Sequence, residues 1–385
     1  MAHRLAKFVR KLVQIFRLKL KHPRNRAPTP NRAHKSEQPP PFVADEPRAE
    51  MRLDDQTSTK YHFASSSTLL AILDDVESSY DFQKTQKVVK AALRYDPSWW
   101  SESFNTQWVK QHERQLNACQ ALSQIFLFHD DGFLRQMALE RLASPLNHPF
   151  VAYGLGLRLN DWVPEIRRVA KITFDRCYAS TPPEIWEEAL WHLLPRSTEW
   201  RRWFMQQKHE EVLYSAAANR QEQLQGLVSR LAASRSSGST TMFRLLARSP
   251  NFDRFLPDLA LGACQPHVRT LALVSIMERE ARWSTGKFER VWHDKVFGRY
   301  QDKEIWRTRP LTLDVDIVPI LTASLHDRSS LVRRRALDLL TRRRDEDELK
   351  PLVQKTLVDL ANDPNPAVQG RLDFLRRSQQ PGFKI

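Results

Sequence analysis

Glycine is scarce in this sequence, with ten glycines among 385 residues. A turn-rich β-fold needs more glycine than that, whereas strong helix formers such as leucine, alanine and arginine are frequent. Long apolar runs are missing too, because no stretch approaches the ~20 residues that cross a bilayer. With a mean hydropathy of −0.55, the composition predicts a soluble all-α protein without a membrane span.

Cysteine and catalytic motifs are equally sparse. Cys119, Cys177 and Cys264 are far apart and odd in number, so neither a disulfide framework nor a Cys-pair zinc site is indicated. We expect a reducing, cytoplasmic compartment. Residues 154–156, Gly-Leu-Gly, lack the third glycine and the preceding strand of a phosphate loop, and no local nucleophile signature occurs. The sequence predicts no enzyme activity and no cofactor.

Three His-Asp pairs are the residues closest to a metal-site motif. A metal phosphohydrolase uses such a pair with further His and Asp ligands. The pairs are His129-Asp130, His293-Asp294 and His326-Asp327. Two of them fall in predicted turns, where a polar turn explains them, and no His-x3-His or Glu-x2-His helix motif supplies more ligands. We expect no metal site.

Positive charge is concentrated at the N-terminus. The net charge is +15, but eleven Lys and Arg residues precede the first acid, Glu37, which leaves +4 for the remainder. Total charge is therefore weak evidence for a protein that coats DNA.

Residues 1–21 have the pattern of a basic amphipathic helix, with apolar residues at three- and four-residue steps and basic residues opposite. Such a helix suits an anionic membrane surface. A cleaved organellar presequence, a segment that binds an acidic partner or nucleic acid, and a merely solvated helix fit the pattern too. The candidate contact residues are Lys7, Phe8, Arg10, Lys11, Leu12, Phe16 and Arg17.

The remaining chain divides by composition and periodicity. Residues 22–60 contain seven prolines among polar residues and predict a disordered linker. Residues 61–121 predict an N-terminal helical cap, residues 122–378 a repeat region, and residues 379–385 a tail.

One spacing recurs along the repeat region. Asp161 is followed five, six and nine residues later by an apolar residue, an arginine and a small apolar residue. Related copies start at His129, Pro195, Ala263, Asp327 and Asp363. The intervals are 32, 34, 68, 64 and 36 residues. Because two intervals are near twice the others, we infer two further degenerate units, around residues 229–246 and 283–300, and about eight helix pairs.

Each unit predicts a helix, a tight polar turn and a second helix. The fifth and ninth residues after the anchor share one helical face and point into the core. The anchor Asp accepts hydrogen bonds from free amides at the start of the second helix. Pro164 and Pro366 suit a first helical turn, where no amide is needed.

The pattern resembles the HEAT repeat, in a short form similar to the units of phycobilin lyases, most clearly in Asp-Pro-Asn-Pro-Ala-Val at residues 363–368. The resemblance covers about residues 122–377 and implies no lyase activity. It implies a right-handed α-solenoid of antiparallel helix pairs after a flexible N-terminal arm. It also implies an Asp–Arg ladder between units, with Asp161, Arg167, Asp327, Arg333 and Asp363 as signature residues and Arg135, Arg201 and Arg269 as further partners. His129, Pro195 and Ala263 replace the Asp, and Gln369 replaces the Arg, so a continuous ladder is not expected.

The predicted second helices carry excess positive charge. In a HEAT-like solenoid these helices line the concave side, and a basic inner surface favours an acidic partner. The candidate partner-binding residues are Arg168, Lys171, Arg202, Arg334, Arg335, Arg342, Arg343 and Arg344. Complementation of helix dipoles and pairing with neighbouring acids explain the same residues equally well.

Two hypotheses follow. The first is a non-enzymatic, cytoplasmic scaffold that binds a protein with an acidic surface on its concave face and is recruited to a membrane surface by its N-terminal helix. The second is a nucleic-acid-binding HEAT protein similar to HEAT-like alkylpurine DNA glycosylases, although no catalytic Asp matches residue by residue. The sequence identifies neither the partner nor the oligomeric state.

Overall fold

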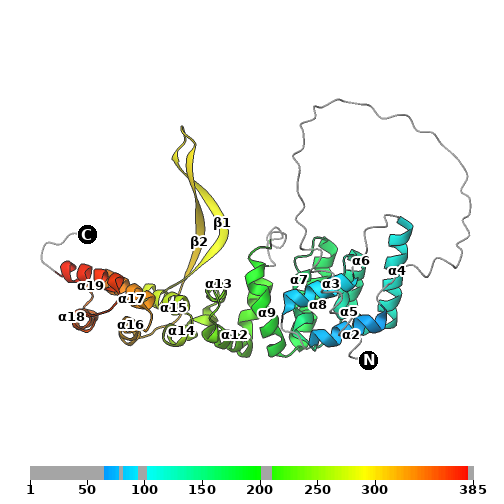
Figure 1. Cartoon of the computed structure of the whole chain (residues 1–385), viewed down its shortest axis with the longest axis horizontal. Coiled ribbons are helices and arrows are strands. Elements are labelled where there is room, and N and C mark those ends of the chain that lie inside the picture. The colour runs from blue at the N-terminus through cyan, green and yellow to red at the C-terminus, as the bar shows by residue number, and fades with distance from the viewer. Residues whose placement is uncertain (1–64, 78–80, 94–101, 201–209, 380–385) are drawn as a thin grey trace, which may run out of the picture. The chain divides into compact units, whose positions relative to one another are not determined.

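The computed structural model describes residues 65–77, 81–93, 102–200 and 210–379. All of them belong to the unit His62–Ile385. This part of the chain is mostly helical, with one two-stranded antiparallel sheet (Figure 1). The predicted N-terminal helix, the linker and residues 380–385 of the tail lie outside the described residues. No helix within the described ranges is long and apolar enough to cross a membrane.

The elements follow one another through short connections. The helices before the sheet are α2 (Ser66–Glu77), α3 (Phe82–Leu93), α4 (Glu102–Ala118), η2 (Gln120–Leu122), α5 (Ser123–Phe126), α6 (Gly132–Arg141), α7 (Pro149–Arg158), α8 (Pro164–Ser180), α9 (Pro183–Ser197), α11 (Glu210–Asn219), α12 (Gln221–Ala233), α13 (Ser239–Leu246), η3 (Pro250–Phe255), α14 (Leu256–Gly262) and α15 (Pro266–Glu278). The strands are β1 (Glu280–Asp294) and β2 (Arg299–Pro310), and they are followed by α16 (Ile317–Leu325), α17 (Ser330–Arg342), α18 (Lys350–Asp359) and α19 (Pro366–Ser378).

The predicted anchor positions set where five of the second helices begin. The helices α6, α8, α15, α17 and α19 each begin three residues after an anchor, namely His129, Asp161, Ala263, Asp327 and Asp363. Pro164 and Pro366 occupy the first turn, as predicted. At Pro195 the prediction of a turn is wrong, because α9 continues to Ser197 and holds that proline in its last turn.

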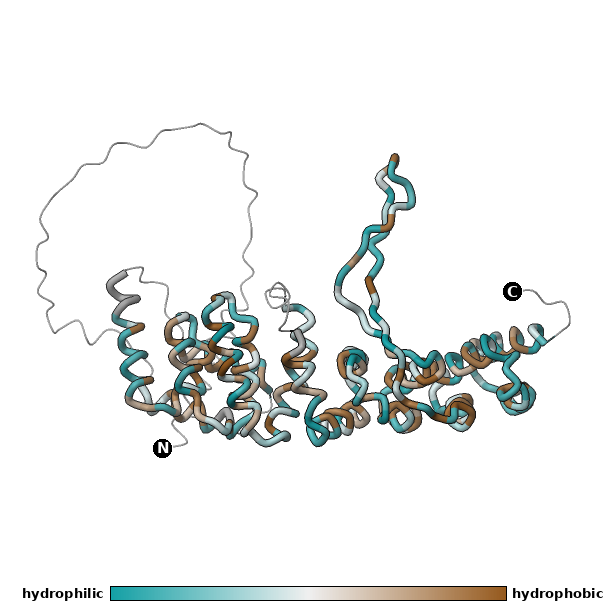
Figure 2. Tube along the Cα trace, turned by 180° about the vertical axis from the view of Figure 1, so that it is seen from behind, coloured by the Kyte–Doolittle hydropathy of each residue, from teal (hydrophilic) through white to brown (hydrophobic). Residues whose placement is uncertain are grey.

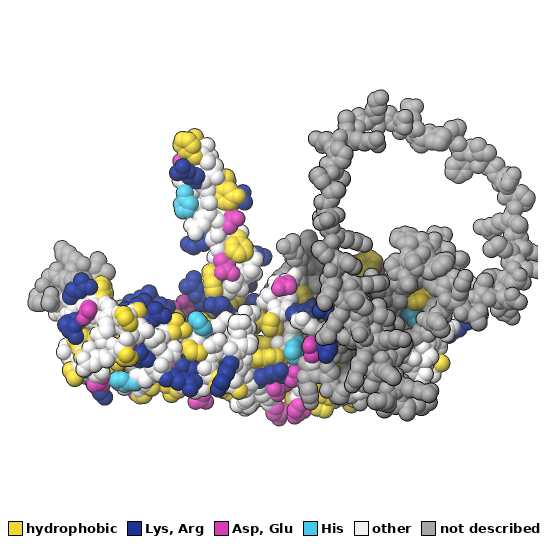
Figure 3. Space-filling view, in the orientation of Figure 1, with side chains coloured by type: hydrophobic (Ala, Val, Ile, Leu, Met, Phe, Trp, Pro, Cys, Tyr) yellow, Lys and Arg dark blue, Asp and Glu magenta, His cyan; other side chains and the backbone are white. Residues whose placement is uncertain are grey.

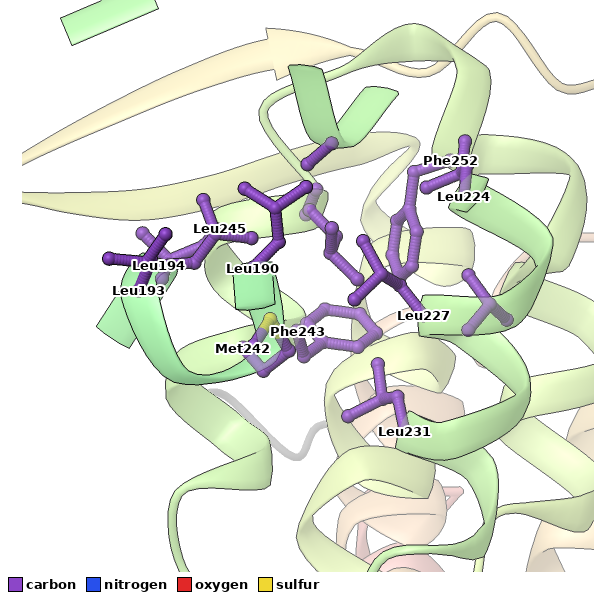
Figure 4. Close-up of a cluster of buried hydrophobic side chains, with 14 of the residues drawn as sticks. Leu190, Leu193, Leu194, Leu224, Leu227, Leu231, Met242, Phe243, Leu245 and Phe252 are labelled. Atoms are coloured by element: carbon purple, nitrogen blue, oxygen red, sulfur yellow. The ribbon is translucent and has the colours of Figure 1, made fainter. Parts of the chain in front are cut away.

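The core is continuous from helix to helix. Leucines three and four residues apart place one face of α9 and one face of α12 against α13 (Figure 4). The contributing residues are Leu190, Leu193 and Leu194 of α9, Leu224, Leu227 and Leu231 of α12, Met242, Phe243 and Leu245 of α13, and Phe252 of η3. Hydrophobic segments alternate with polar ones along every helix, as an amphipathic stack requires (Figure 2).

Buried arginine–aspartate pairs join successive helix pairs. In each, the Nε and Nη2 atoms of the arginine donate to the two carboxylate oxygens, which is the bidentate geometry that a guanidinium favours. The pairs are Arg135 with Asp161 at 2.9 and 3.0 Å, Arg269 with Asp327 at 2.7 and 2.8 Å, and Arg333 with Asp363 at 2.6 and 3.0 Å. These ladder contacts connect the unit that carries the arginine to the one that carries the aspartate.

Each ladder arginine also secures its own turn. Arg333 Nη1 donates to the carbonyl oxygen of Asp327 at 2.8 Å, and Asp327 Oδ1 accepts the Ser329 amide at 2.7 Å. Gln369 keeps this part of the pattern, because its amide Nε2 donates to the Asp363 carbonyl at 2.9 Å. The turn and the junction between units therefore depend on one side chain.

Residues 280–310 correct the all-α prediction and the predicted helical unit around residues 283–300. They form an antiparallel hairpin whose outermost Cα partners are Glu280 and Pro310. Arg269 reaches Asp327 across this insertion. The units anchored at Ala263 and Asp327 are thus joined directly, and their 64-residue interval reflects an inserted hairpin.

His129, one of the His-Asp candidates, is a buried structural residue. Its Nδ1 accepts the Asp131 amide at 2.9 Å, and its Nε2 lies 3.0 Å from His112 Nδ1. A neutral His129 with its proton on Nε2 satisfies both contacts. Burial lowers the pKa of His112 to about 4. Burial, together with His112 and Arg135, lowers the pKa of His129 to about 3.

The histidine pair predicts acid sensitivity. Because both folded-state pKa values lie below the ordinary 6.5, the unfolded chain binds more protons below that pH, and stability falls as pH drops from about 6.5 toward 4. Thermal melts at stepped pH should show a lower Tm across this window. The His112→Gln variant should flatten the dependence, whereas exposed His293→Gln should not. Parallel pH profiles for both variants and the parent would contradict the assignment.

The ladder predicts a large cost for a single deletion. Replacing Arg269, whose side chain is 2% exposed, by Met leaves the Asp327 carboxylate without its partner and should lower the free energy of unfolding by about 3 to 5 kcal/mol. Adding Asp327→Asn should recover part of that loss. Urea unfolding measures both, with exposed Lys355→Met on α18 as control. Equal effects of Arg269→Met and Lys355→Met would exclude a structural role for the pair.

Candidate functional site at the β-hairpin

The predicted partner-binding residues are only partly accounted for. Arg168 is exposed on α8, and Lys171 forms an ion pair with Asp175 of the same helix. Arg202 lies outside the described residues, as do the N-terminal candidates Lys7, Phe8, Arg10, Lys11, Leu12, Phe16 and Arg17.

The arginines of α17 gather beside the end of α15. Arg335 and Arg342 each place a terminal nitrogen 3.8 Å from the same Glu278 carboxylate oxygen. Arg343, just after α17, donates to the Met277 carbonyl at 3.0 Å. Since α15 leads directly into β1, these predicted residues lie near the start of the hairpin.

Two further arginines complete this group. Arg334 is half-buried, and its Nε atom has no hydrogen-bond partner. Arg344 donates to the Thr341 carbonyl at 2.9 Å. We call the set Arg334, Arg335, Arg342, Arg343 and Arg344 the arginine surface. Figure 3 shows Lys and Arg side chains clustered where the hairpin joins the helices.

The hairpin has a fixed base. Arg309 of β2 donates to both carboxylate oxygens of buried Asp253 at 2.9 and 2.6 Å, and to the carbonyls of Ala247 and Ser249. Thr312 adds its amide and hydroxyl to the same carboxylate. A lone two-stranded hairpin is marginally stable in water, so this buried pair anchors the ribbon to η3.

The chain enters the hairpin through a sharp turn. Arg279 ends α15 with a φ of 53°, the left-handed conformation typical of helix termini. The Leu311 amide then donates to the Arg279 carbonyl at 3.0 Å. Entry and exit of the hairpin are thus held together by a backbone hydrogen bond.

Arginines and aromatic rings alternate near the base. The guanidinium groups of Arg244 and Arg282 lie 5.4 and 4.9 Å from the Trp306 ring centre, within the range of cation–π attraction. A cavity of about 320 Å³ lies beside them, lined by Tyr214, Ser215, Ala217, Ala218, Asn219, Leu245, Leu246, Arg248, Ser249, Trp283 and Arg307.

Residues 284–306, which we call the hairpin arm, extend away from the helices (Figure 1). Trp292 and Tyr300 are cross-strand partners with ring centres 5.3 Å apart, and Arg290 lies 3.8 Å from the Tyr300 ring centre. Cross-strand aromatic and cation–π contacts of this kind stabilise a ribbon that has no third strand.

The end of the arm exposes apolar side chains. Asp294 Oδ1 accepts the amides of Val296 and Phe297 at 2.9 and 3.1 Å, and Gly298 follows with a φ of 64°. Val296 is 89% exposed and Phe297 75% exposed. Because this turn is ordered by its own hydrogen bonds, its apolar side chains are held in water, as expected of a contact surface.

Other chemistry is not indicated in the described ranges. No group of three or more potential metal ligands occurs there, and the three cysteines are free. His293 lies 3.4 Å from Gln301, and His326 lies 3.3 Å from Asp359. No protein-family model matches the chain, and no curated protein matches it significantly.

Sequence reasoning missed the hairpin, although a local signal was present. Residues 287–292, Lys-Phe-Glu-Arg-Val-Trp, are rich in β-branched and aromatic residues, and residues 294–298 contain the Asp and Gly of a turn. The 64-residue interval suggested a further repeat unit instead. A comparison of helical and strand periodicity over residues 280–310 would have separated the two.

The base contact predicts a local effect of one substitution. Asp253→Ala leaves Arg309 without its carboxylate, so amide hydrogen exchange over residues 280–310 should accelerate at least tenfold. The exposed pair of Asp302 with Arg290 provides a control, since such pairs contribute little. Mass-spectrometric exchange should show no change at the base for Asp302→Ala. Similar acceleration in both variants would contradict the anchoring role of Asp253.

Proposed function

We propose that the chain is a non-enzymatic scaffold, an α-solenoid of HEAT-like helix pairs, that binds an acidic partner through the hairpin arm and the arginine surface. The helix pairs serve as a rigid support, because their junctions depend on buried bidentate ladder contacts. Recruitment to a membrane by the N-terminal helix remains a prediction.

The observation that carries this proposal is the ordered, exposed hairpin arm. Its strands span 15 and 12 residues, and most of their side chains are exposed. Phe288 is 64% exposed and Trp292 43% exposed. Large apolar groups that stay in water on an anchored ribbon gain stability when a partner covers them.

The charge of the partner follows from the cations around the arm. The described part of the chain offers no ion-pair partner to several of them, namely Lys287, Lys295, Arg299, Lys303 and Arg307. Arg335 and Arg342 share the single Glu278 carboxylate. An acidic partner compensates these charges and is attracted at long range.

Excision of the arm tests this function. Cα partners Arg282 and Thr308 can be joined by an Asn-Gly turn, which suits a two-residue hairpin loop. The variant keeps Arg309 and Asp253, so its helical circular dichroism and Tm should match those of the parent. Cross-linking affinity purification from cells should lose the molecules that the parent retains.

The matched control is Lys355→Gln, an exposed cation on α18, which should retain every cross-linked molecule. Reversal of Arg335 and Arg342 to Glu should weaken capture without removing the arm. If the excised variant folds and captures the same molecules as the parent, the proposed function is wrong.

A further inference from the structure

We infer that the acidic partner is duplex DNA and that the hairpin arm enters its major groove, an assignment that rests on the proposed function. The first argument is dimension. A strand of 12 residues is about 40 Å long, and paired strands lie about 4.8 Å apart. The major groove of B-form DNA is about 12 Å wide and admits a two-stranded ribbon.

The acids of the arm are mostly engaged within the hairpin. Asp294 orders the turn, Asp302 pairs with Arg290, and Glu304 accepts the Ser284 hydroxyl. The cations Lys287, Lys295, Arg299 and Lys303 have no acidic partner among the described residues. The charge that the arm presents to a partner is therefore positive along both strands, as a ribbon between two phosphate backbones requires.

The apolar turn supplies a contact of another kind. Phe297 and Val296 end the ribbon (Figure 3), so a ribbon lying in the groove presents them to base edges. The thymine methyl group is the apolar element of the major-groove pattern, and phenylalanine is among the residues that contact it. Phosphate contacts then position the arm, and the turn contributes base contact.

This assignment distinguishes DNA from other acidic partners. The major groove of A-form RNA is deep and too narrow for side chains to enter, so an RNA duplex excludes the arm. An anionic membrane attracts cations and takes up an apolar turn, but its flat surface does not use cations spread along the whole ribbon. Cations from the turn to the base favour a groove.

Fluorescence anisotropy with the full chain tests the inference. The probes are a duplex DNA of about 20 base pairs, an RNA duplex of the same sequence and a single strand, each titrated between about 50 and 300 mM salt. We expect the DNA duplex to bind at least tenfold more tightly than the RNA duplex. Excision of residues 283–307 should remove that preference.

Two sets of substitutions separate phosphate from base contact. Lys287→Gln, Lys295→Gln and Lys303→Gln together should reduce the slope of log affinity against log salt by about 2 to 3, since each phosphate contact contributes about 0.9. Phe297→Ser should weaken binding about tenfold and leave the slope unchanged. The Lys355→Gln control on α18 should alter neither quantity. All these residues are exposed, so thermal melts should show intact folding.

Several outcomes overturn the inference. Equal affinity for DNA and RNA duplexes, or unchanged DNA affinity after excision of the arm, excludes major-groove binding. Absence of duplex binding, together with sedimentation on vesicles containing about 30% phosphatidylserine that depends on Phe297, assigns the arm to lipid. If duplex binding is absent and excision still removes a cross-linked protein, the DNA assignment fails and the proposed scaffold function stands. If excision changes neither, both fail.

Discussion

The buried pairing of an arginine in one turn with an aspartate in the next is the interaction on which the helix stack depends. Its geometry couples two tasks, because Arg333 binds the carbonyl of its own turn and both carboxylate oxygens of Asp363. Burial makes the pair costly to break by halves, since the remaining charge stays desolvated. Local turn geometry and the packing of neighbouring units are thereby tied to the same atoms.

The hairpin is inserted without interrupting this coupling. Arg269 and Asp327, which lie on either side of it in sequence, still make their bidentate contact. The hairpin brings its own version of the interaction in Arg309 and Asp253. A projecting element with exposed aromatic side chains is thus attached to the stack by the same chemistry, and its outer residues remain available to a partner.

Much of the helical architecture was predictable because one local pattern specifies it. Asp161 and Asp327 mark turns by the hydrogen bonds of their carboxylates, and Pro164 and Pro366 mark helix starts. Interval counting failed at residues 280–310, since length alone does not distinguish a repeat from an insertion. The arginines of α17 were predictable as a basic set, but their position beside the hairpin depends on long-range contacts such as Arg343 with Met277.

The arm has a further consequence for the protein's behaviour at high concentration. A two-stranded sheet has two open edges, and unpaired backbone amides and carbonyls along an edge invite another chain to add as a strand. The register shift between Ser284 and Phe288 breaks the regularity of one edge, and Lys287 and Lys303 place charge along both strands. Irregularity and lysine are the means by which solitary strands avoid edge-to-edge aggregation. The same cations that face a partner thus also keep the ribbon from self-association.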